Sequence, residues 1–360
     1  MALAGAAVLG LQPATPAGAA PAATALPPLP EPNSHGLTFQ DWAPSPGSGS
    51  GRAGDLTVTT SAVFTPRGAS GDVTKPVKVR ILLPAGYQTD PAKPYDVLYL
   101  LHGGRGDFEQ WSKSDAGNVE AALAGSAFKG IVVMPEGGKA GWFSDWAGKT
   151  DGGFAPLWET FHIKQLVPYI DANFNTKKTR SGRAVAGASM GGYGALRYAG
   201  RHPDLFSAVG TFSGGTDIYQ SNAQKIVDDS MWVYGAAFYW TGLADGAYRV
   251  TASTQGRMET VFGPSSTWPS LNPLNLALDD KYAAYTGKFA MYAGTEETDV
   301  QGWNQSLHAN LNSRKVTHEF CTGTGTHDWK YWVQDLKDFA AYVYGGEKGT
   351  CPNGWGTPVK

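Results

Sequence analysis

Apolar residues along this chain gather into short runs, and most of these runs end in glycine. The runs that are almost continuously apolar are typical of strands buried on both faces of a sheet. Two earlier segments, residues 55–66 and 76–84, instead alternate β-branched and polar residues, which predicts two antiparallel strands. The predicted buried strands lie within residues 95–104, 129–138, 183–192, 288–297 and 316–325.

Segments with helical periodicity separate these runs. Strands that alternate with helices predict an α/β domain with a mainly parallel central sheet and helices on both faces. In such sheets the functional residues lie beyond the carboxyl ends of the strands, which here are the glycine-rich loops. The predicted helices lie within residues 118–127, 158–174, 191–200, 300–312 and 328–344.

The alternation is interrupted at residues 216–269, a stretch dense in aromatic residues (MWVYGAAFYW). We interpret it as a small helical and aromatic insertion that caps the sheet; an ordinary buried pair of helices is the alternative. The catalytic domain is predicted to span residues 55–345, with a short C-terminal tail at 346–360. Residues 20–54 are rich in Pro, Gly and Ser, which predicts an arm or linker.

The first 30 residues contain no charged side chain. Residues 2–11 form an apolar run of signal-peptide length, and Ala17-Gly18-Ala19 matches a cleavage site. We expect residues 1–19 to be a signal peptide with a truncated start, so the protein would be secreted, either free outside the cell or associated with the cell wall. A disordered Ala/Pro linker is the alternative.

Composition narrows the function. Of the 360 residues 42% are hydrophobic and 17% charged, and the net charge is −2, so no basic field is present to hold nucleic acid. No other stretch approaches the roughly 18 apolar residues of a membrane span. No metal-ligand cluster or nucleotide-binding loop is visible, so we expect neither a metal nor a cofactor. Cys321 and Cys351 are expected to form a disulfide in an exported protein; two unpaired thiols are the alternative.

The segment GASMGG at residues 187–192 carries the clearest chemical signal. A GxSxG turn between a strand and a helix is a nucleophile elbow, in which the serine occupies a strained backbone conformation and its neighbours must be small. Gly187 and Gly191 flank Ser189 in this way. Ser189 is therefore the predicted nucleophile.

A serine nucleophile needs a base, and the base needs an orienting acid. In α/β-hydrolases the chain order is serine, acid, histidine. His327 lies in a glycine-rich loop (GTGTHDW) after the last predicted strand, and we favour it as the base. Three other histidines follow Ser189; they are His202, His308 and His318.

The acid should follow the preceding strand, where the sequence is AGTEETD. We favour Glu297, and Glu296 and Asp299 remain alternatives. The oxyanion hole requires two backbone N–H groups. We expect them from Met190, directly after the nucleophile, and Gly104, in the loop that follows the 95–104 strand. His102 in that loop is expected to be a structural hydrogen-bonding residue.

Several motifs taken together resemble the esterase D superfamily, in particular the secreted actinobacterial branch that includes the antigen 85 mycolyltransferases. The resemblance covers roughly residues 75–345. In chain order the motifs are LLHGGRGDFEQW, VVMPEGG with WFSDW, LWETF, GASMGG, RHPDLFSAVGTFSG and GTHDWKYW.

This resemblance implies an α/β-hydrolase fold with Ser189 as nucleophile and His327 as base. It also implies that Arg105 and Trp329 contact substrate. The mycolyltransferases have Asp-Gly-Leu where this chain has His102-Gly103-Gly104, and their acid lies further along the following helix. These departures favour a general esterase over a mycolyltransferase.

The leading hypothesis is an exported serine esterase that acts on a small-molecule, lipid or sugar ester through an acyl-enzyme. An acyltransferase that passes the acyl group to a sugar or glycerol hydroxyl is the second, and a non-catalytic binding protein on the same fold is the third. For acyl transfer, aromatic residues after the first two buried strands could form a sugar platform, although packing under a loop would explain them equally. These residues are Trp111, Trp142, Phe143 and Trp146.

Overall fold

The computed structural model describes most of the chain from residue 26 onward. The described residues are 26–46, 48–63, 65–67, 71–73, 76–149, 155–232, 257–346 and 349–360. The expected signal peptide at residues 1–19 lies outside them, as does the aromatic centre of the expected insertion, residues 233–256.

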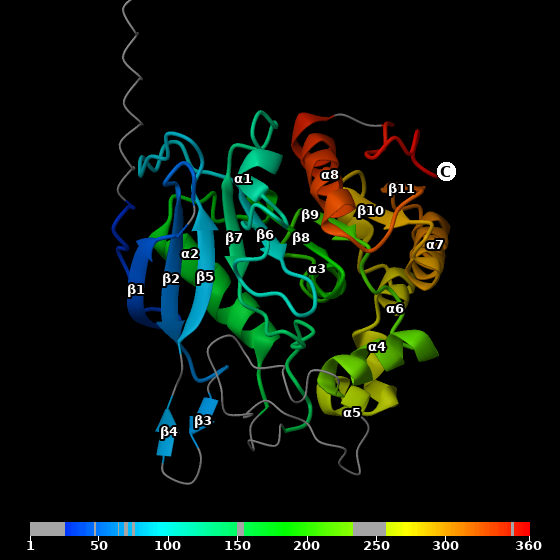
Figure 1. The fold of residues 1–360 in the computed structure, drawn as a ribbon, viewed down its shortest axis with the longest axis horizontal. Helices are drawn as coiled ribbons and strands as arrows, with labels where there is room; N and C mark the ends of the chain where they lie inside the picture. Colours follow the sequence, from blue (N-terminus) through cyan, green and yellow to red (C-terminus); the bar gives the residue numbers. More distant parts are fainter. Residues whose placement is uncertain are drawn as a thin grey trace, which may run out of the picture.

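A nine-stranded sheet forms the centre of the described chain (Figure 1). A separate two-stranded ribbon pairs β3 (Thr65–Arg67) with β4 (Gly71–Val73). In spatial order, the strands of the central sheet are β1 (Thr38–Pro44), β2 (Ala53–Thr59), β5 (Val77–Leu82), β7 (Ile131–Pro135), β6 (Val97–Leu101), β8 (Arg183–Ala188), β9 (Ala208–Phe212), β10 (Phe289–Gly294) and β11 (Glu319–Gly323).

The six strands from β7 to β11 in this spatial order run parallel to one another, and β1, β2 and β5 pair antiparallel at one edge. Every residue of β6, β7, β8, β9 and β10 is buried. This agrees with their nearly continuous apolar sequences, since a strand covered on both faces has no polar side. The mainly parallel sheet and the antiparallel pair at its start are therefore confirmed.

Helices connect the parallel strands. The α-helices are α1 (Val119–Ala122), α2 (Val167–Asn173), α3 (Met190–Arg201), α4 (Ser221–Trp232), α5 (Arg257–Phe262), α6 (Pro273–Leu278), α7 (Thr298–Ser313) and α8 (Trp329–Ala340). Segments of π-helix precede α2 and follow α8, at Thr160–Leu166 and Ala341–Gly345. None of the helices in the described part of the chain combines the length and apolar character that crossing a bilayer requires.

The two faces of the sheet are covered by different helices, which makes two apolar cores (Figure 1). The larger core includes Ile170 of α2, Leu196 of α3 and Leu307 of α7. The smaller core includes Val119 of α1 and Leu336 of α8. Helices on both faces of the sheet, as expected, leave the loops at the carboxyl ends of the strands available for a site.

Two strands of the central sheet were not anticipated from the sequence. β1 lies inside residues 20–54, where the composition predicts an arm; it is an edge strand whose side chains are exposed or half-buried, so it lacks a strong apolar pattern. β9 is five residues long and fully buried, and it lies directly after the predicted elbow helix. Strands this short are hard to separate from a loop by periodicity.

Cys321 on β11 and Cys351 in the tail form the expected disulfide. The tail then packs back on the domain: the N–H of Val359 donates to the carbonyl of Phe320 at 2.8 Å. The indole N–H of Trp355 donates to the carbonyl of Thr324 at 3.0 Å. The tail therefore contacts the backbone just before His327.

Candidate active site

Ser189 stands on a sharp turn between β8 and α3. Its backbone has φ 54° and ψ −117°, a left-handed conformation that is costly for any residue except glycine. The turn is held by the N–H of Ser189, which donates to the carbonyl of Phe212 on β9 at 2.8 Å. The serine side chain is half-buried at the carboxyl edge of the sheet, as the elbow motif predicts.

The glycines of the elbow are required by space. A Cβ at Gly187 would lie 2.4 Å from the carbonyl oxygen of Gly191, and one at Gly191 would lie 2.3 Å from that of Leu101. Both obstacles are backbone atoms, which cannot move aside as a flexible side chain can. The two glycines therefore allow β6, β8 and α3 to approach closely at the point where Ser189 is presented.

His327 and Glu297 complete a hydrogen-bonded chain with Ser189. The serine Oγ lies 2.7 Å from Nε2 of His327, and Nδ1 of that ring contacts Oε2 of Glu297. The Glu297 side chain is only 4% exposed, whereas that of His327 is 42% exposed. The structure thus brings together the three residues that the sequence favoured, and the carboxylate is shielded from solvent behind the ring.

The other candidates lie elsewhere. Glu296 and Asp299 are exposed, and Asp299 accepts a hydrogen bond from Asn222. His202 contacts Glu159, while His308 and His318 contact each other.

Two residues that the sequence did not indicate support the carboxylate. The hydroxyl of Ser213 donates to Oε1 of Glu297 at 2.8 Å, and the indole N–H of Trp332 donates to the Ser213 oxygen at 3.1 Å. The N–H of Gly294 also donates to Oε1, at 3.0 Å. The Trp332 ring lies edge-on against His327, with 4.8 Å between centroids. Contacts from Ser213, directly after β9, and from Trp332 on α8 therefore position Glu297 and His327.

The two expected oxyanion donors lie next to each other beside the serine. A Cβ built on Gly104 would be 4.0 Å from Cβ of Met190. Met190 is the first residue of α3, and an N–H in the first turn of a helix has no intrahelical acceptor. The amino end of α3 also favours negative charge near Ser189.

His102 shapes the loop that carries Gly104. It is buried, its Nδ1 lies 2.8 Å from the carbonyl oxygen of Gly103, and its Nε2 accepts from the N–H of Gly137 at 2.9 Å. Burial lowers the pKa of His102, which favours the neutral ring that this pair of contacts requires. His102 is thus a structural residue, as expected, and links the loops after β6 and β7.

A cavity of about 510 Å³ opens at Ser189. Arg105 lines it, as expected, together with Lys139, which the sequence did not indicate. Helix α4, from the expected insertion, contributes Ile226, Asp229 and Ser230 to the wall. The full lining comprises Gly103, Gly104, Arg105, Gln110, Lys139, Trp142, Ser189, Met190, Ile226, Asp229, Ser230, His327 and Trp332.

The aromatic residues that line the cavity are not all the ones that the sequence led us to expect. Trp329, expected to contact substrate, is half-buried against Trp111 and Trp332, and it is Trp332 that lines the cavity. Trp329 and Trp332 are three residues apart on α8, so they occupy neighbouring positions on one face of the helix. The sequence motif alone therefore does not show which of them lines the cavity.

Of the four residues considered as a sugar platform, Trp142 lines the cavity. Trp111, Phe143 and Trp146 are buried in the domain and are absent from the cavity wall.

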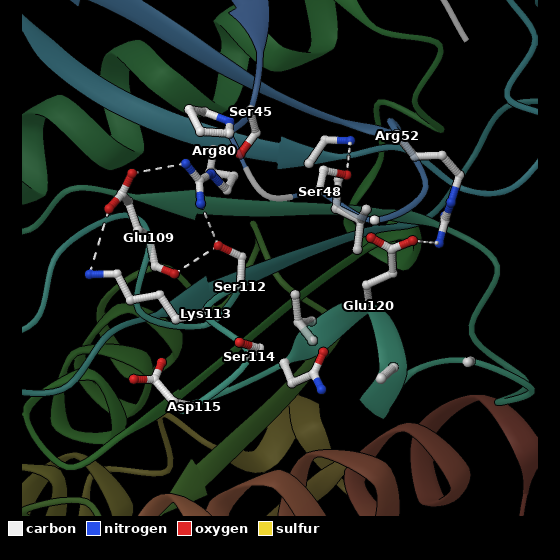
Figure 2. Close-up of a pocket in the computed structure, with 18 residues that line it drawn as sticks. Ser45, Ser48, Arg52, Arg80, Glu109, Ser112, Lys113, Ser114, Asp115 and Glu120 are labelled. Atoms are coloured by element: carbon white, nitrogen blue, oxygen red, sulfur yellow. Dashed lines mark hydrogen bonds and ion pairs between the residues drawn. The ribbon is translucent and has the colours of Figure 1, made fainter. Parts of the chain in front are cut away.

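A second, larger cavity of about 810 Å³ lies between β5 and α1 (Figure 2). Its charged groups other than Asp115 pair with one another. Arg80 donates to both oxygens of Asp55, to Ser112 and to Glu109, and Arg52 pairs with Glu120. Figure 2 shows Arg80 directed at Glu109 and Ser112, so its guanidinium has little left to offer a ligand. The smaller cavity, which contains Ser189, is the better candidate for chemistry.

The sequence is similar to those of an esterase and a mycolyltransferase. Esterase Rv1288 of Mycobacterium tuberculosis is 32% identical over 259 residues, which are 69% of this chain and 52% of that protein. The diacylglycerol acyltransferase/mycolyltransferase Ag85A of Mycobacterium leprae is 29% identical over 253 residues, 67% of this chain and 72% of that protein. The chain spans about half the length of the first of these relatives.

Solved structures of similar fold include hydrolases. The fluorophosphonate-binding serine hydrolase FphF of Staphylococcus aureus superposes with a TM-score of 0.58 at 18% identity, covering 81% of this chain and 98% of its own. The S-formylglutathione hydrolase of the same organism gives 0.57 at 18% identity, covering 86% and 99%. At these identities the likeness concerns the fold, and it confirms the α/β-hydrolase architecture.

The family model described as "Putative esterase" matches residues 70–342, a span that contains the elbow, the histidine loop and the cavity between them. With the elbow, the histidine loop and the fold in agreement, this chain belongs to the esterase family of α/β-hydrolases.

Proposed function

We propose that this chain is a serine carboxylic-ester hydrolase with a Ser189–His327–Glu297 catalytic triad. The observation that carries the proposal is the 2.7 Å contact between the serine Oγ and Nε2 of a histidine whose other nitrogen meets a buried carboxylate. That arrangement supplies a nucleophile, a base and an acid that orients the base.

In the first half of the reaction, Nε2 of His327 accepts the Ser189 hydroxyl proton as Oγ attacks the ester carbonyl. Glu297 holds the ring through Nδ1 and stabilises the imidazolium that forms. The N–H groups of Gly104 and Met190 donate to the oxyanion. Collapse of the tetrahedral intermediate expels the alcohol, which takes the proton from His327, and leaves the acyl group on Ser189. In the second half, His327 takes a proton from water as the water attacks the acyl carbon. The bond to Ser189 Oγ then breaks, His327 returns the proton to Oγ, and the carboxylic acid is released.

Replacing the nucleophile tests the proposal. Ser189→Ala should lower kcat for 4-nitrophenyl esters by about 10⁴-fold or more, because only oxyanion binding and substrate positioning remain. A fluorophosphonate probe should label the wild-type protein and leave the variant unlabelled. Ser207→Ala is the control, because Ser207 directly precedes β9 and so lies at the opposite edge of the parallel sheet from Ser189. Full activity or labelling of the Ser189→Ala protein would refute the mechanism.

Acyl transfer is the second candidate, and the similarity to mycolyltransferases favours it. It would use the same acyl-enzyme with a sugar or glycerol hydroxyl in place of water. Mass spectrometry of the products decides between them: acyl glycerol or acyl trehalose formed in competition with water supports transfer, and free acid alone supports hydrolysis.

We further propose that the protein is exported and functions outside the cell, and that its catalytic domain comprises residues 55–345 together with β1 and the first residues of β2. The disulfide between Cys321 and Cys351 supports this, because such bonds persist in oxidising compartments. Secretion of the full chain by a host cell, with cleavage after Ala19 detected by N-terminal sequencing, is the expected result. A protein that stays inside the cell with residues 1–19 still attached would contradict this proposal.

A further inference from the structure

The loop that carries His327 is built from glycines and threonines, with the sequence GTGT at residues 323–326. Side chains this small bury little apolar surface, so the loop depends on its neighbours for order. On one side it is held by the loop of the proposed acid Glu297: the N–H of Glu296 donates to the carbonyl of Gly325 at 3.1 Å. This contact keeps the histidine loop beside the carboxylate.

The other side of the histidine loop is covered by Trp355 of the C-terminal tail. The indole N–H of Trp355 donates to the carbonyl of Thr324 at 3.0 Å. Its ring fills the space that two glycines leave open: a Cβ at Gly323 would lie 2.2 Å from Cδ1 of Trp355, and one at Gly325 would lie 3.0 Å from Cζ2. Tyr331 of α8 stacks on the same ring, with 6.3 Å between centroids. The histidine loop is therefore enclosed between the loop of the proposed acid and the tail.

The tail that carries Trp355 is itself fixed to the domain by side chains. The disulfide joins Cys351 to Cys321 on β11. The side-chain amide of Asn353 donates to Asp335 of α8, which is 1% exposed, at 3.1 Å. The position of the indole is thus set from β11 and α8, the two elements between which the histidine loop lies.

The contact that this arrangement protects is sensitive to small movements. Nε2 of His327 lies 2.7 Å from Oγ of Ser189, although the histidine side chain is 42% exposed. A displacement of about 1 Å would lengthen this contact beyond hydrogen-bonding distance, and misplacements of that size can cost about 100-fold in rate. Trp355 is not one of the described residues that line the cavity, so its effect on the reaction is exerted through the loop.

We propose that Trp355 is a positioning residue for the base: held by the disulfide-anchored tail, it fixes the loop from which His327 moves protons to and from Ser189. The inference rests on the proposed hydrolase function and gives the C-terminal tail a part in the rate of the reaction.

The test compares two esters of one acid, 4-nitrophenyl butyrate and ethyl butyrate. 4-Nitrophenolate leaves without a proton, whereas the ethyl alcohol must receive one from His327 as its bond breaks, so a misplaced base harms the ethyl ester more. Trp355→Ala should lower kcat/KM for ethyl butyrate about 10- to 100-fold and that for 4-nitrophenyl butyrate less, so that the ratio of the two values changes about threefold or more. Partial unfolding would lower both values by the same factor.

Two further variants sharpen the comparison. Trp355→Phe loses the N–H donor but keeps a ring over the glycines, so it should recover most of the ratio and lower kcat/KM for ethyl butyrate no more than about tenfold. Tyr87→Ala is the matched control: Tyr87 is a half-buried ring stacked on Tyr95, just before β6 and so at the edge of the parallel strands opposite His327. It should leave the ratio unchanged. An unchanged ratio in Trp355→Ala, or an equal change in Tyr87→Ala, overturns the inference while the hydrolase function stands.

Hydrogen exchange followed by mass spectrometry decides the inference without turnover. The amides of residues 323–328 should exchange about tenfold faster or more in Trp355→Ala than in the wild type, and at the wild-type rate in Tyr87→Ala. Equal exchange in Trp355→Ala and the wild type overturns the positioning role. A wild type that hydrolyses neither ester overturns the proposed function instead, and the exchange rates still decide whether Trp355 orders the loop.

The part of the disulfide is tested in the same way. The double variant Cys321→Ala with Cys351→Ala frees the tail and should raise the exchange of residues 323–328 as Trp355→Ala does. Wild-type exchange in this double variant would overturn the anchoring by the disulfide.

Discussion

At the scale of single residues, the contacts of the proposed acid explain how an imidazole on a loop can be held in place. The carboxylate of Glu297 receives Ser213 and Gly294 on one oxygen and His327 on the other. Ser213 itself has φ 49° and is 3% exposed, so its side chain is fixed by its own backbone and by Trp332. The acid is thereby oriented before substrate binds, which preorganises the base.

We predict that Ser213→Ala lowers kcat about 10- to 100-fold with little change in KM. A hydrogen bond to a charged group contributes about 1.5–3 kcal/mol, and its loss allows the carboxylate to turn away from His327. Ser207→Ala is the matched control, because Ser207 lies at the other end of β9 and bonds only to backbone carbonyls.

A double variant tests whether Trp332 acts through Ser213. Trp332→Phe removes the N–H donor and retains a ring beside His327. If the two residues form one chain, Ser213→Ala with Trp332→Phe is no slower than Ser213→Ala alone. Additive losses, or equal losses from Ser207→Ala and Ser213→Ala, would contradict the assignment.

The sequence could indicate Ser189, His327 and Glu297 because each lies in a loop at a recognisable position relative to a strand. Ser213 and Trp332 could not be found in this way. Ser213 follows β9, a strand that was itself missed, and Trp332 lies one helical turn from Trp329, the aromatic favoured by resemblance. Their role depends on a contact between residues 119 positions apart, which no local pattern reports.

At the scale of secondary-structure elements, the elbow is where three elements meet with least space. We predict that Gly191→Ala destabilises the protein by about 2–4 kcal/mol and lowers esterase activity, because the new methyl group would meet the carbonyls of Leu101 and His102. Gly302→Ala is the control: Gly302 lies within α7 and has no neighbour within 4 Å of a built Cβ. It should stabilise the protein by about 0.5–1 kcal/mol.

Urea unfolding measures both glycine variants on one scale. Equal stabilities of Gly191→Ala and the wild type would show that the backbone at the elbow can relax, and the steric account would then be wrong.

The strands that the sequence predicted best are those in which every residue is buried. β6, β7, β8 and β10 are apolar throughout, so their sequences report their position in the sheet. β1 is an edge strand whose side chains are mostly exposed, and its neighbours are proline- and glycine-rich. Its position is set by main-chain hydrogen bonds to β2, and these leave little trace in side-chain hydrophobicity.

At the scale of the whole molecule, buried ionisable groups make stability depend on pH. Burial, together with the neighbouring Asp338, raises the pKa of Glu319 to about 8. The hydroxyl of Tyr292 lies 3.1 Å from Glu319 and 2.8 Å from Asp338, in the core beside the disulfide. On the acid side, burial lowers the pKa of His162 to about 3 and that of His318 to about 4.

Glu319 and the two histidines change the stability in opposite directions as the pH rises. Glu319 keeps its proton in the folded state and loses it on unfolding, so its contribution to stability falls as the pH rises from about 4.5 to about 8. The two histidines stay neutral when folded and gain protons on unfolding, so stability also falls as the pH drops below about 6.5.

We predict that Glu319→Gln flattens the alkaline side of the stability profile. Between pH 5 and 8 the wild-type unfolding free energy should decline by up to roughly 1.4 kcal/mol per pH unit from this group, and the variant should lack that slope. Thermal unfolding across the pH range measures it. Glu296→Gln, in the exposed loop between β10 and α7, should retain the wild-type profile, and identical slopes in both variants would refute the role of Glu319.

The left-handed backbone of Ser189 also restricts how this enzyme can evolve. A residue branched at Cβ is strongly disfavoured at φ 54°, so threonine, although it carries a hydroxyl, is a poor replacement at this turn. Cysteine, unbranched at Cβ, fits the same backbone and retains a nucleophile. In proteins that keep this elbow, evolution can therefore replace the proposed serine nucleophile by cysteine but not by threonine. This restriction holds for any substrate that the cavity accepts.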